Sequence, residues 1–226
     1  MIKLQHGLAC GAAAMLMAGS LVGCAPLLVG GVVVGGSMLM TDRRTTGAQI
    51  EDESIESKAK TRVHALATLG QISITSYNRT ALVTGQVPGE NEKAQVTRAV
   101  SGVENLRTVV NELAVGPNAS LSSRSNDAVV LTKVKASMVD AKDLQANTFK
   151  VVVDRGVVYL MGRVTEREAT RGTNLSRSVP GVQKVVRVFE ILTEEELAAL
   201  GTSHAPAAPA ASAPVAAPAA AASAVQ

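Results

Sequence analysis

This sequence contains an internal repeat, and the repeat limits the possible folds more than any other feature. Three stretches of the first half recur in the same order in the second half: 52–63 as 127–138, 81–87 as 158–164, and 101–103 as 180–182. The offset between the copies grows from 75 to 79 residues, which corresponds to two small insertions in the second copy. A repeat of this kind predicts two copies of one small fold.

Each copy has the periodicity of a helix, two strands, a second helix and a third strand. In the second copy, apolar residues recur at helical spacing from Val130 to Ala141, with Asp127 as the expected N-cap and Thr165 beginning a capping box. Strands are expected near 149–153, 158–164 and 182–191; in the first copy, helices near 53–68 and 89–101 and strands near 71–77, 81–87 and 105–113. We therefore expect an α+β fold, with a small three-stranded sheet packed against two helices in each copy.

The two copies are also expected to pack together. A domain of about 60 residues buries too little surface to be more than marginally stable, so docking would add buried area. Gly85 and Gly162 occupy the same place in the second strand of the two copies. A side chain at either position is expected to crowd a neighbouring helix or strand.

The amino-terminal residues indicate export and lipid anchoring. Lys3 is followed by an apolar stretch, and Leu21-Val22-Gly23-Cys24 resembles the lipobox of bacterial lipoproteins. We expect residues 1–23 to be a signal peptide and Cys24 to become the mature terminus, carrying acyl chains such as palmitate. The alternative is an uncleaved signal anchor, because residues 25–40 are also uncharged and a membrane span needs about 20 apolar residues.

The two copies, with the anchor before them, resemble a known family. The motifs that carry the resemblance to the BON domain are Asn126-Asp127, Thr132–Lys135, Val158–Gly162 and Val164–Ala169. A lipobox followed by two such domains is similar to the dual-BON outer-membrane lipoproteins of Gram-negative bacteria. The resemblance implies a non-enzymatic envelope role: binding of anionic phospholipid and maintenance of outer-membrane integrity, in some members at the division site.

The resemblance also sets the expected location and domain order. Residue 25 is Ala rather than Asp, which in Gram-negative lipoproteins points to the outer membrane, with the protein in the inner leaflet and facing the periplasm. The expected divisions are a lipidated terminus and Gly-rich apolar tether (24–50), a first BON domain (51–113), a linker (114–125), a second BON domain (126–192), and a short helix with an extended Ala/Pro-rich tail (193–226).

The folded part offers little for catalysis. Both Cys lie before residue 25, and His64 is interpreted as a histidine on the flank of the first helix. No His, Cys, Asp and Glu cluster has metal-ligand spacing, and no phosphate-loop pattern appears. We therefore expect neither an enzyme nor a cofactor. Aromatic residues are too few for a base-stacking surface, and the export signal argues against a nucleic-acid partner.

Charge separates the two copies. Residues 51–113 hold seven basic and eight acidic residues, whereas residues 126–192 hold eleven basic and seven acidic residues. The first helix of the second copy is expected to meet anionic phospholipid through Val129, Lys133, Lys135 and Lys142. The alternative is an envelope protein-interaction or scaffold module that uses exposed strand edges and does not bind lipid directly. An ordinary solvated surface would also account for the positive charge.

Overall fold

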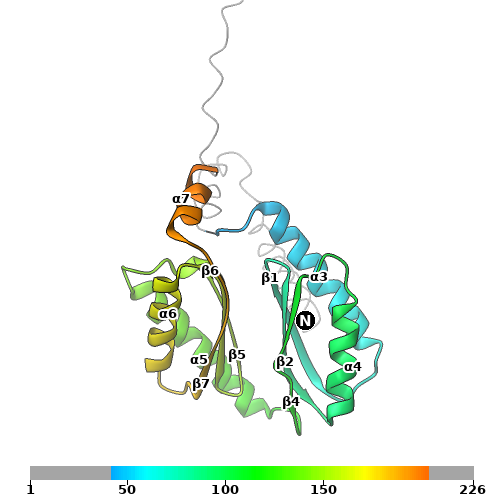
Figure 1. The fold of residues 1–226 in the computed structure, drawn as a ribbon. Helices are drawn as coiled ribbons and strands as arrows, with labels where there is room; N and C mark the ends of the chain where they lie inside the picture. The colour runs from blue at the N-terminus through cyan, green and yellow to red at the C-terminus, as the bar shows by residue number, and fades with distance from the viewer. Residues whose placement is uncertain (1–41, 204–226) are drawn as a thin grey trace, which may run out of the picture. The chain divides into compact units, whose positions relative to one another are not determined.

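The computed structural model describes residues 42–203. Cys24, the signal peptide, most of the Gly-rich tether and the Ala/Pro-rich tail were predicted from sequence, and they lie outside the described residues. The described chain is α+β, with two copies of one fold that each carry two helices on a small mixed sheet (Figure 1). The predicted fold class is confirmed.

In the first domain, two helices cover one face of a sheet (Figure 1). The elements are α3 (Thr46–His64), β1 (Gln71–Tyr77), β2 (Thr80–Val87), α4 (Glu90–Ser101), β3 (Thr108–Asn111) and β4 (Ala114–Val115). β2 pairs antiparallel with β1 and parallel with β3 and then β4, so the single third strand that was predicted is interrupted after Asn111. Ile55, Ala59 and Val63 follow one another at helical spacing and anchor α3 in the core.

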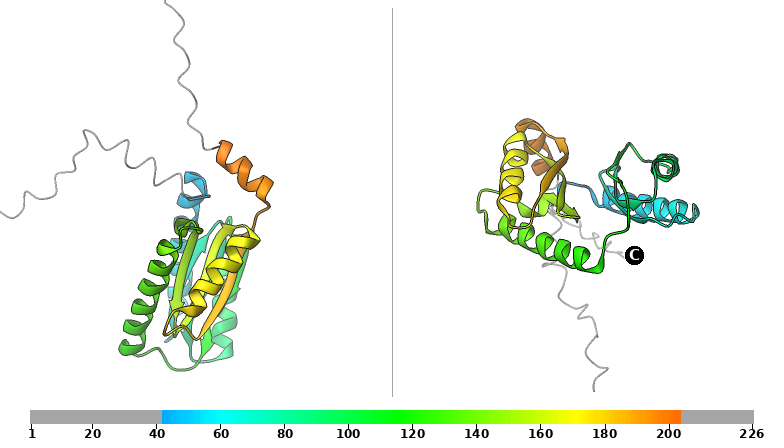
Figure 2. Two further views of the ribbon diagram at one scale, coloured as in Figure 1. Left: turned by 90° about the vertical axis from the view of Figure 1, so that its left-hand side faces the viewer. Right: turned by 90° about the horizontal axis from the view of Figure 1, so that it is seen from below.

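The second domain repeats this arrangement. Its elements are α5 (Leu121–Asp140), the 3-10 turn η1 (Ala146–Thr148), β5 (Phe149–Asp154), β6 (Val157–Val164), α6 (Glu166–Ser178), β7 (Lys184–Ile191) and α7 (Glu194–Ser203). β6 pairs antiparallel with β5 and parallel with β7. α5 and α6 lie side by side on the same face of this sheet (Figure 2). The predicted capping box of α6 is present, between Thr165 and Glu168.

The first helix of each domain begins earlier than predicted. α5 begins at Leu121, where the Ser120 side chain accepts a hydrogen bond from the N–H of Ser123, so Asp127 is not the N-cap. α3 likewise begins at Thr46, after the cap residue Thr45. The opening turns escaped prediction because they bury no apolar side chain. Consequently, β4 and the first residues of α5 occupy part of the predicted linker, and 116–120 connects the two domains.

Instead of capping a helix, Asp127 and its counterpart Asp52 each bind the β-hairpin turn of their own domain. The carboxylate of Asp127 is buried and accepts the N–H groups of Arg155 and Gly156, both at 2.8 Å. Asp52 accepts the N–H groups at the same turn of the first domain, those of Asn78 at 2.7 Å and of the next residue at 2.8 Å. The residues of both two-residue turns have positive φ. Such a turn matches the twist of the strands, but its backbone conformation is unfavourable for residues other than glycine.

One of the three sequence matches between the copies is wrong. Arg107 and Gln183 each donate their N–H to a carbonyl in the hairpin turn of their own domain, so these two residues correspond. At this offset of 76 residues, Gly181 corresponds to Asn105 and not to Gly102. Gly181 and Asn105 both have positive φ, of 101° and 63°. The match was missed because two different residues hold this position, and asparagine is one of the few residues besides glycine that adopt positive φ.

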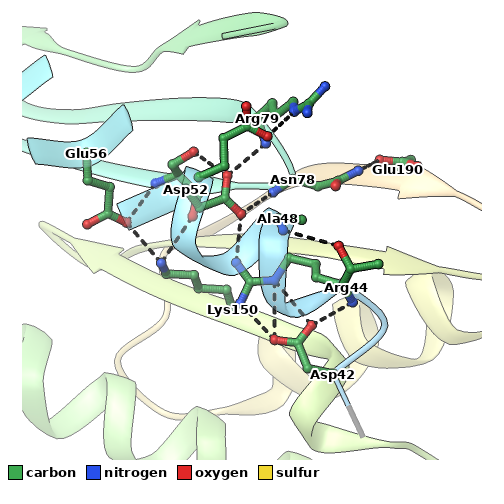
Figure 3. Close-up of polar contacts among 12 residues, drawn as sticks. Asp42, Arg44, Ala48, Asp52, Glu56, Asn78, Arg79, Lys150 and Glu190 are labelled. Atoms are coloured by element: carbon green, nitrogen blue, oxygen red, sulfur yellow. Dashed lines mark hydrogen bonds and ion pairs between the residues drawn. The ribbon is translucent and has the colours of Figure 1, made fainter. Parts of the chain in front are cut away.

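The prediction that the two copies pack together is confirmed. The sheet faces not covered by helices share a third apolar cluster, which holds Tyr77 and Leu82 from the first domain and Tyr159 and Met161 from the second, all at most 4% exposed. On one side of this cluster, Lys150 of β5 donates to the carbonyl of Ser76 at 3.1 Å and to the Glu56 carboxylate at 3.0 Å (Figure 3).

The residues just before α3 connect the two domains. Arg43 forms two hydrogen bonds with the Glu168 carboxylate, at 2.7 and 2.8 Å, and both side chains are less than 10% exposed. The Arg43 and Arg163 side chains each donate to the other's carbonyl, at 2.9 and 3.0 Å. Arg44 bridges Asp42 and Asp52 (Figure 3). Its guanidinium also lies 4.2 Å from the centre of the Tyr77 ring.

Gly162 is expected to be essential for strand packing. A Cβ atom there would lie 2.5 Å from the carbonyl oxygen of Thr148, which is backbone and cannot rotate away. Gly162→Ala should therefore destabilise the fold by about 1–3 kcal/mol, measured by urea denaturation. Gly47→Ala is the matched control, because its Cβ would meet nothing closer than 3.9 Å in a helix, and it should raise stability slightly. Equal stability of the two variants would contradict the steric argument.

The domain contact at Glu168 is expected to weaken in acid. Burial alone would raise the pKa of Glu168, but hydrogen bonds from Arg43 and from the Thr165 N–H outweigh it and hold this pKa below its ordinary value of 4.5. A group with a lowered folded-state pKa contributes its full stabilisation above 4.5, and this is lost as the pH falls through the lowered value. Glu168→Gln should thus lower the free energy of unfolding near neutral pH, and the difference from wild type should shrink in acid.

The matched control is Glu196→Gln, in the capping box that Thr193 and Glu196 form at the start of α7. Glu196 is exposed and forms no ion pair with an arginine of the described chain, so this change should have little effect. Urea titrations at several pH values measure both variants. A loss of stability in Glu168→Gln that is independent of pH would show that the charge of Glu168 is not what matters.

Candidate functional site

The four residues predicted to bind phospholipid are exposed, but the structure brings only two of them together. Val129 and Lys133 of α5 line the same surface hollow, of about 710 Å³. Lys135 lies on the other flank of α5, and Lys142 follows the end of the helix in the loop before η1. The expectation that Lys142 belongs to this helix is therefore wrong, because the helix ends at Asp140.

Arg155 is a residue of this hollow that the sequence reasoning missed. It is in the hairpin turn held by Asp127, and its side chain lies in the hollow with Lys133 and Asn126. Within residues 42–203, no carboxylate forms an ion pair with Arg155. In the first domain, Asn78 takes the place of Arg155, and the next residue of the turn, Arg79, is paired with Glu51. The sequence signal is Asp154-Arg155-Gly156, residues typical of a turn between the two expected strands, but this signal does not show which residues lie near the turn.

The outward face of α5 carries no charge along its length. The residues that follow one another at helical spacing on this face are all exposed: Leu121, Ser125, Ala128, Val129, Thr132, Ala136 and Val139. Three large apolar side chains stand out, with Leu121 72%, Val129 51% and Val139 69% exposed. This face therefore offers apolar side chains, without any charge between them, to whatever the helix contacts.

Basic residues border this uncharged face on both sides. Arg124 and Lys135 lie on one side and Lys133 lies on the other, and all three are exposed. Of the two acidic residues in α5, Asp127 is buried against the hairpin turn and Asp140 is the last residue of the helix. The face therefore combines apolar side chains that can enter a lipid layer with cations that can meet phosphate groups.

The corresponding helix of the first domain lacks this pattern. Aligning the two buried aspartates places Glu53 of α3 at the position of Ala128, and Ser54 at the position of Val129. Lys58 and Lys60 match Lys133 and Lys135, but both are paired with carboxylates, those of Glu104 and Glu56. The two domains thus share a fold and differ in this one surface.

We also examined the described residues for metal ligands, for the position of His64 and for membrane-spanning helices. No three His, Cys, Asp or Glu side chains within it lie close enough together to hold a metal ion. His64 is exposed at the end of α3. None of the helices between residues 42 and 203 is both long and apolar enough to cross a bilayer.

The family model of the BON domain matches residues 51–117 and 126–193. The chain therefore belongs to the BON-domain family and carries two copies of its domain. It is 37% identical over 155 residues to the "Outer membrane lipoprotein DolP" of Haemophilus influenzae, an alignment that covers 67% of this chain and 80% of that protein. The fold, the tandem repeat and this similarity define a two-BON-domain protein of the DolP type.

Other relatives are more distant. The chain is 27% identical over 151 residues to the "21 kDa hemolysin" of Actinobacillus pleuropneumoniae, covering 66% of this chain and 78% of that protein. It is 22% identical over 155 residues to the "Osmotically-inducible protein Y" of Escherichia coli, covering 66% of this chain and 77% of that protein.

Proposed function

We propose that this protein is anchored by Cys24 in the inner leaflet of the outer membrane, faces the periplasm, and binds anionic phospholipid through α5 of its second BON domain. In this role it supports the integrity of the envelope and catalyses no reaction. The observation that carries the proposal is the uncharged outward face of α5, bordered by Arg124, Lys133 and Lys135. The similarity to an outer-membrane lipoprotein supports the proposed location.

The contact can be described by the chemistry of each part. Leu121, Val129 and Val139 would enter the interface between headgroups and acyl chains, where exposed apolar area is stabilised. Each cation near an anionic surface contributes about 1 kcal/mol. Lys133 and Arg155 line one hollow, and two cations there support the proposal that a headgroup phosphate binds in it. The helix carries no aromatic residue, so its apolar anchoring is weak and binding depends on charge.

Lipid binding is tested with the fragment 42–226, which forms a compact unit by itself. It should co-sediment with vesicles containing phosphatidylglycerol and not with vesicles of phosphatidylcholine alone. Lys133→Glu combined with Lys135→Glu should weaken binding by at least about thirtyfold, because each lysine contributes about 1 kcal/mol and each glutamate adds repulsion. Binding should also fall steeply as salt is added.

Lys58→Glu combined with Lys60→Glu is the matched control, since it makes the same change at the same positions of the first domain. It should leave vesicle binding nearly unchanged. Equal losses in the two double variants would mean that net charge, not α5, drives binding. If neither added salt nor the change of Lys133 and Lys135 to glutamate weakens binding, the protein-interaction module is favoured instead.

The anchor has its own test. Mass spectrometry of the membrane fraction should find an amino terminus at Cys24 that carries acyl chains, and Cys24→Ala should leave the protein unprocessed. Cys10→Ala is the control, because Cys10 has no lipobox before it, and this variant should be processed normally. A mature protein that still begins at Met1 would overturn the lipoprotein assignment and favour a signal anchor.

A further inference from the structure

A second hollow, of about 550 Å³, lies between the two sheets on the side where β3 and β7 run. Val110 of β3 and Val186, Val188 and Phe189 of β7 line it. Each of these strands is the outermost of its sheet on that side: β3 pairs with β2 and β7 with β6. Within residues 42–203, no other strand pairs with their outer edges. Two open strand edges therefore border one hollow.

The opposite side of the two sheets is closed. There Lys150 of β5 bonds to the Ser76 carbonyl of β1 and to Glu56. The sheets are thus joined along β1 and β5. On the other side the Asn78 side chain donates to Glu190 near the end of β7, while the outer edges of β3 and β7 stay unpaired among the described strands. Unpaired strand edges with apolar side chains beside them are templates for another strand, and natural proteins usually block them. β7 is eight residues long, which is ample for pairing.

The charges around the hollow select a particular occupant. Two of the four charged residues that line it are already paired: Arg187 with Glu166 at 2.7 Å and Glu190 with Arg163 at 3.0 Å. The other two, Arg107 and Glu112, have no ion-pair partner among the described residues. They flank β3 on either side, and five residues of extended chain separate them by about 17 Å.

We propose that this hollow, which shares no residue with α5, binds an extended strand of a partner protein by adding it to the open edges of β3 and β7. The partner strand has apolar residues at alternate positions, which pack on Val110, Val186 and Val188. It carries an acidic residue where it passes Arg107 and a basic residue where it passes Glu112. A peptide fits this site better than an acyl chain, because only a peptide supplies hydrogen bonds to the strand edges.

The test uses three blocked peptides of six residues, with threonine and valine alternating between the two end residues, so that the ends match the spacing of Arg107 and Glu112. One ends in Asp and Lys, one in Asp at both ends, and one in Lys at both ends. Fluorescence anisotropy with the fragment 42–226 should show that the mixed-charge peptide binds best. Arg107→Glu should shift the preference to the peptide with two Lys by about tenfold, and Glu112→Lys should shift it to the peptide with two Asp.

Arg98→Glu is the matched control, an exposed arginine of α4 outside the hollow, and it should leave the order of affinities unchanged. The bound mixed-charge peptide should also slow hydrogen exchange at the β7 amides. The proposal fails if none of the peptides binds more tightly than about 1 mM, if the order of affinities ignores both charge changes, or if decanoate alone occupies the hollow. Vesicle binding by Arg107→Glu and Glu112→Lys should equal that of wild type, so this test is separate from that of lipid binding.

Discussion

The bond between a helix carboxylate and a hairpin turn is the interaction on which each domain depends. Asp52 and Asp127 lie on the buried face of their helices and accept two backbone N–H groups from the turn that follows the first strand. A two-residue turn with positive φ at both positions is unfavourable for residues such as Asn78 and Arg79, and the carboxylate offsets that cost. The same bond fixes the helix against the hairpin, and so determines which helix face remains outside.

The two domains share this fold but differ in the outward surface of their first helix. In the second domain, the turn carries Arg155 without a carboxylate partner in the described chain, beside the uncharged outward face of α5. In the first domain, Asn78 takes the place of Arg155, and Glu53 interrupts the helix face. Since the fold is the same in both copies, the difference lies in surface chemistry, and the lipid contact that we propose is confined to the second domain.

The two faces of each sheet pack on different partners. One face of each sheet packs on helices, and the other joins the shared cluster around Tyr77, Leu82, Tyr159 and Met161. Arg43 adds a buried ion pair with Glu168, which also caps α6. Burying two charges is favourable only when their hydrogen bonds are satisfied, and here the carboxylate accepts from both Arg43 and the Thr165 N–H. The segment that leads to the predicted lipid anchor is therefore part of the domain contact.

The sequence by itself determined the repeat, the order of the elements and the fold class, because periodicity and turn residues are local and survive in both copies. It predicted β1 and the capping box of α6 correctly, and it marked Val129 and Lys133. It could not place the starts of α3 and α5, whose opening turns bury nothing apolar, and it took Asp127 for a cap. Only the tertiary structure decided that Arg155 lines the same hollow as Lys133, that Arg43 reaches Glu168, and that β3 and β7 are left open beside one hollow. Each of these depends on contacts between residues far apart in the chain, and no local pattern encodes them.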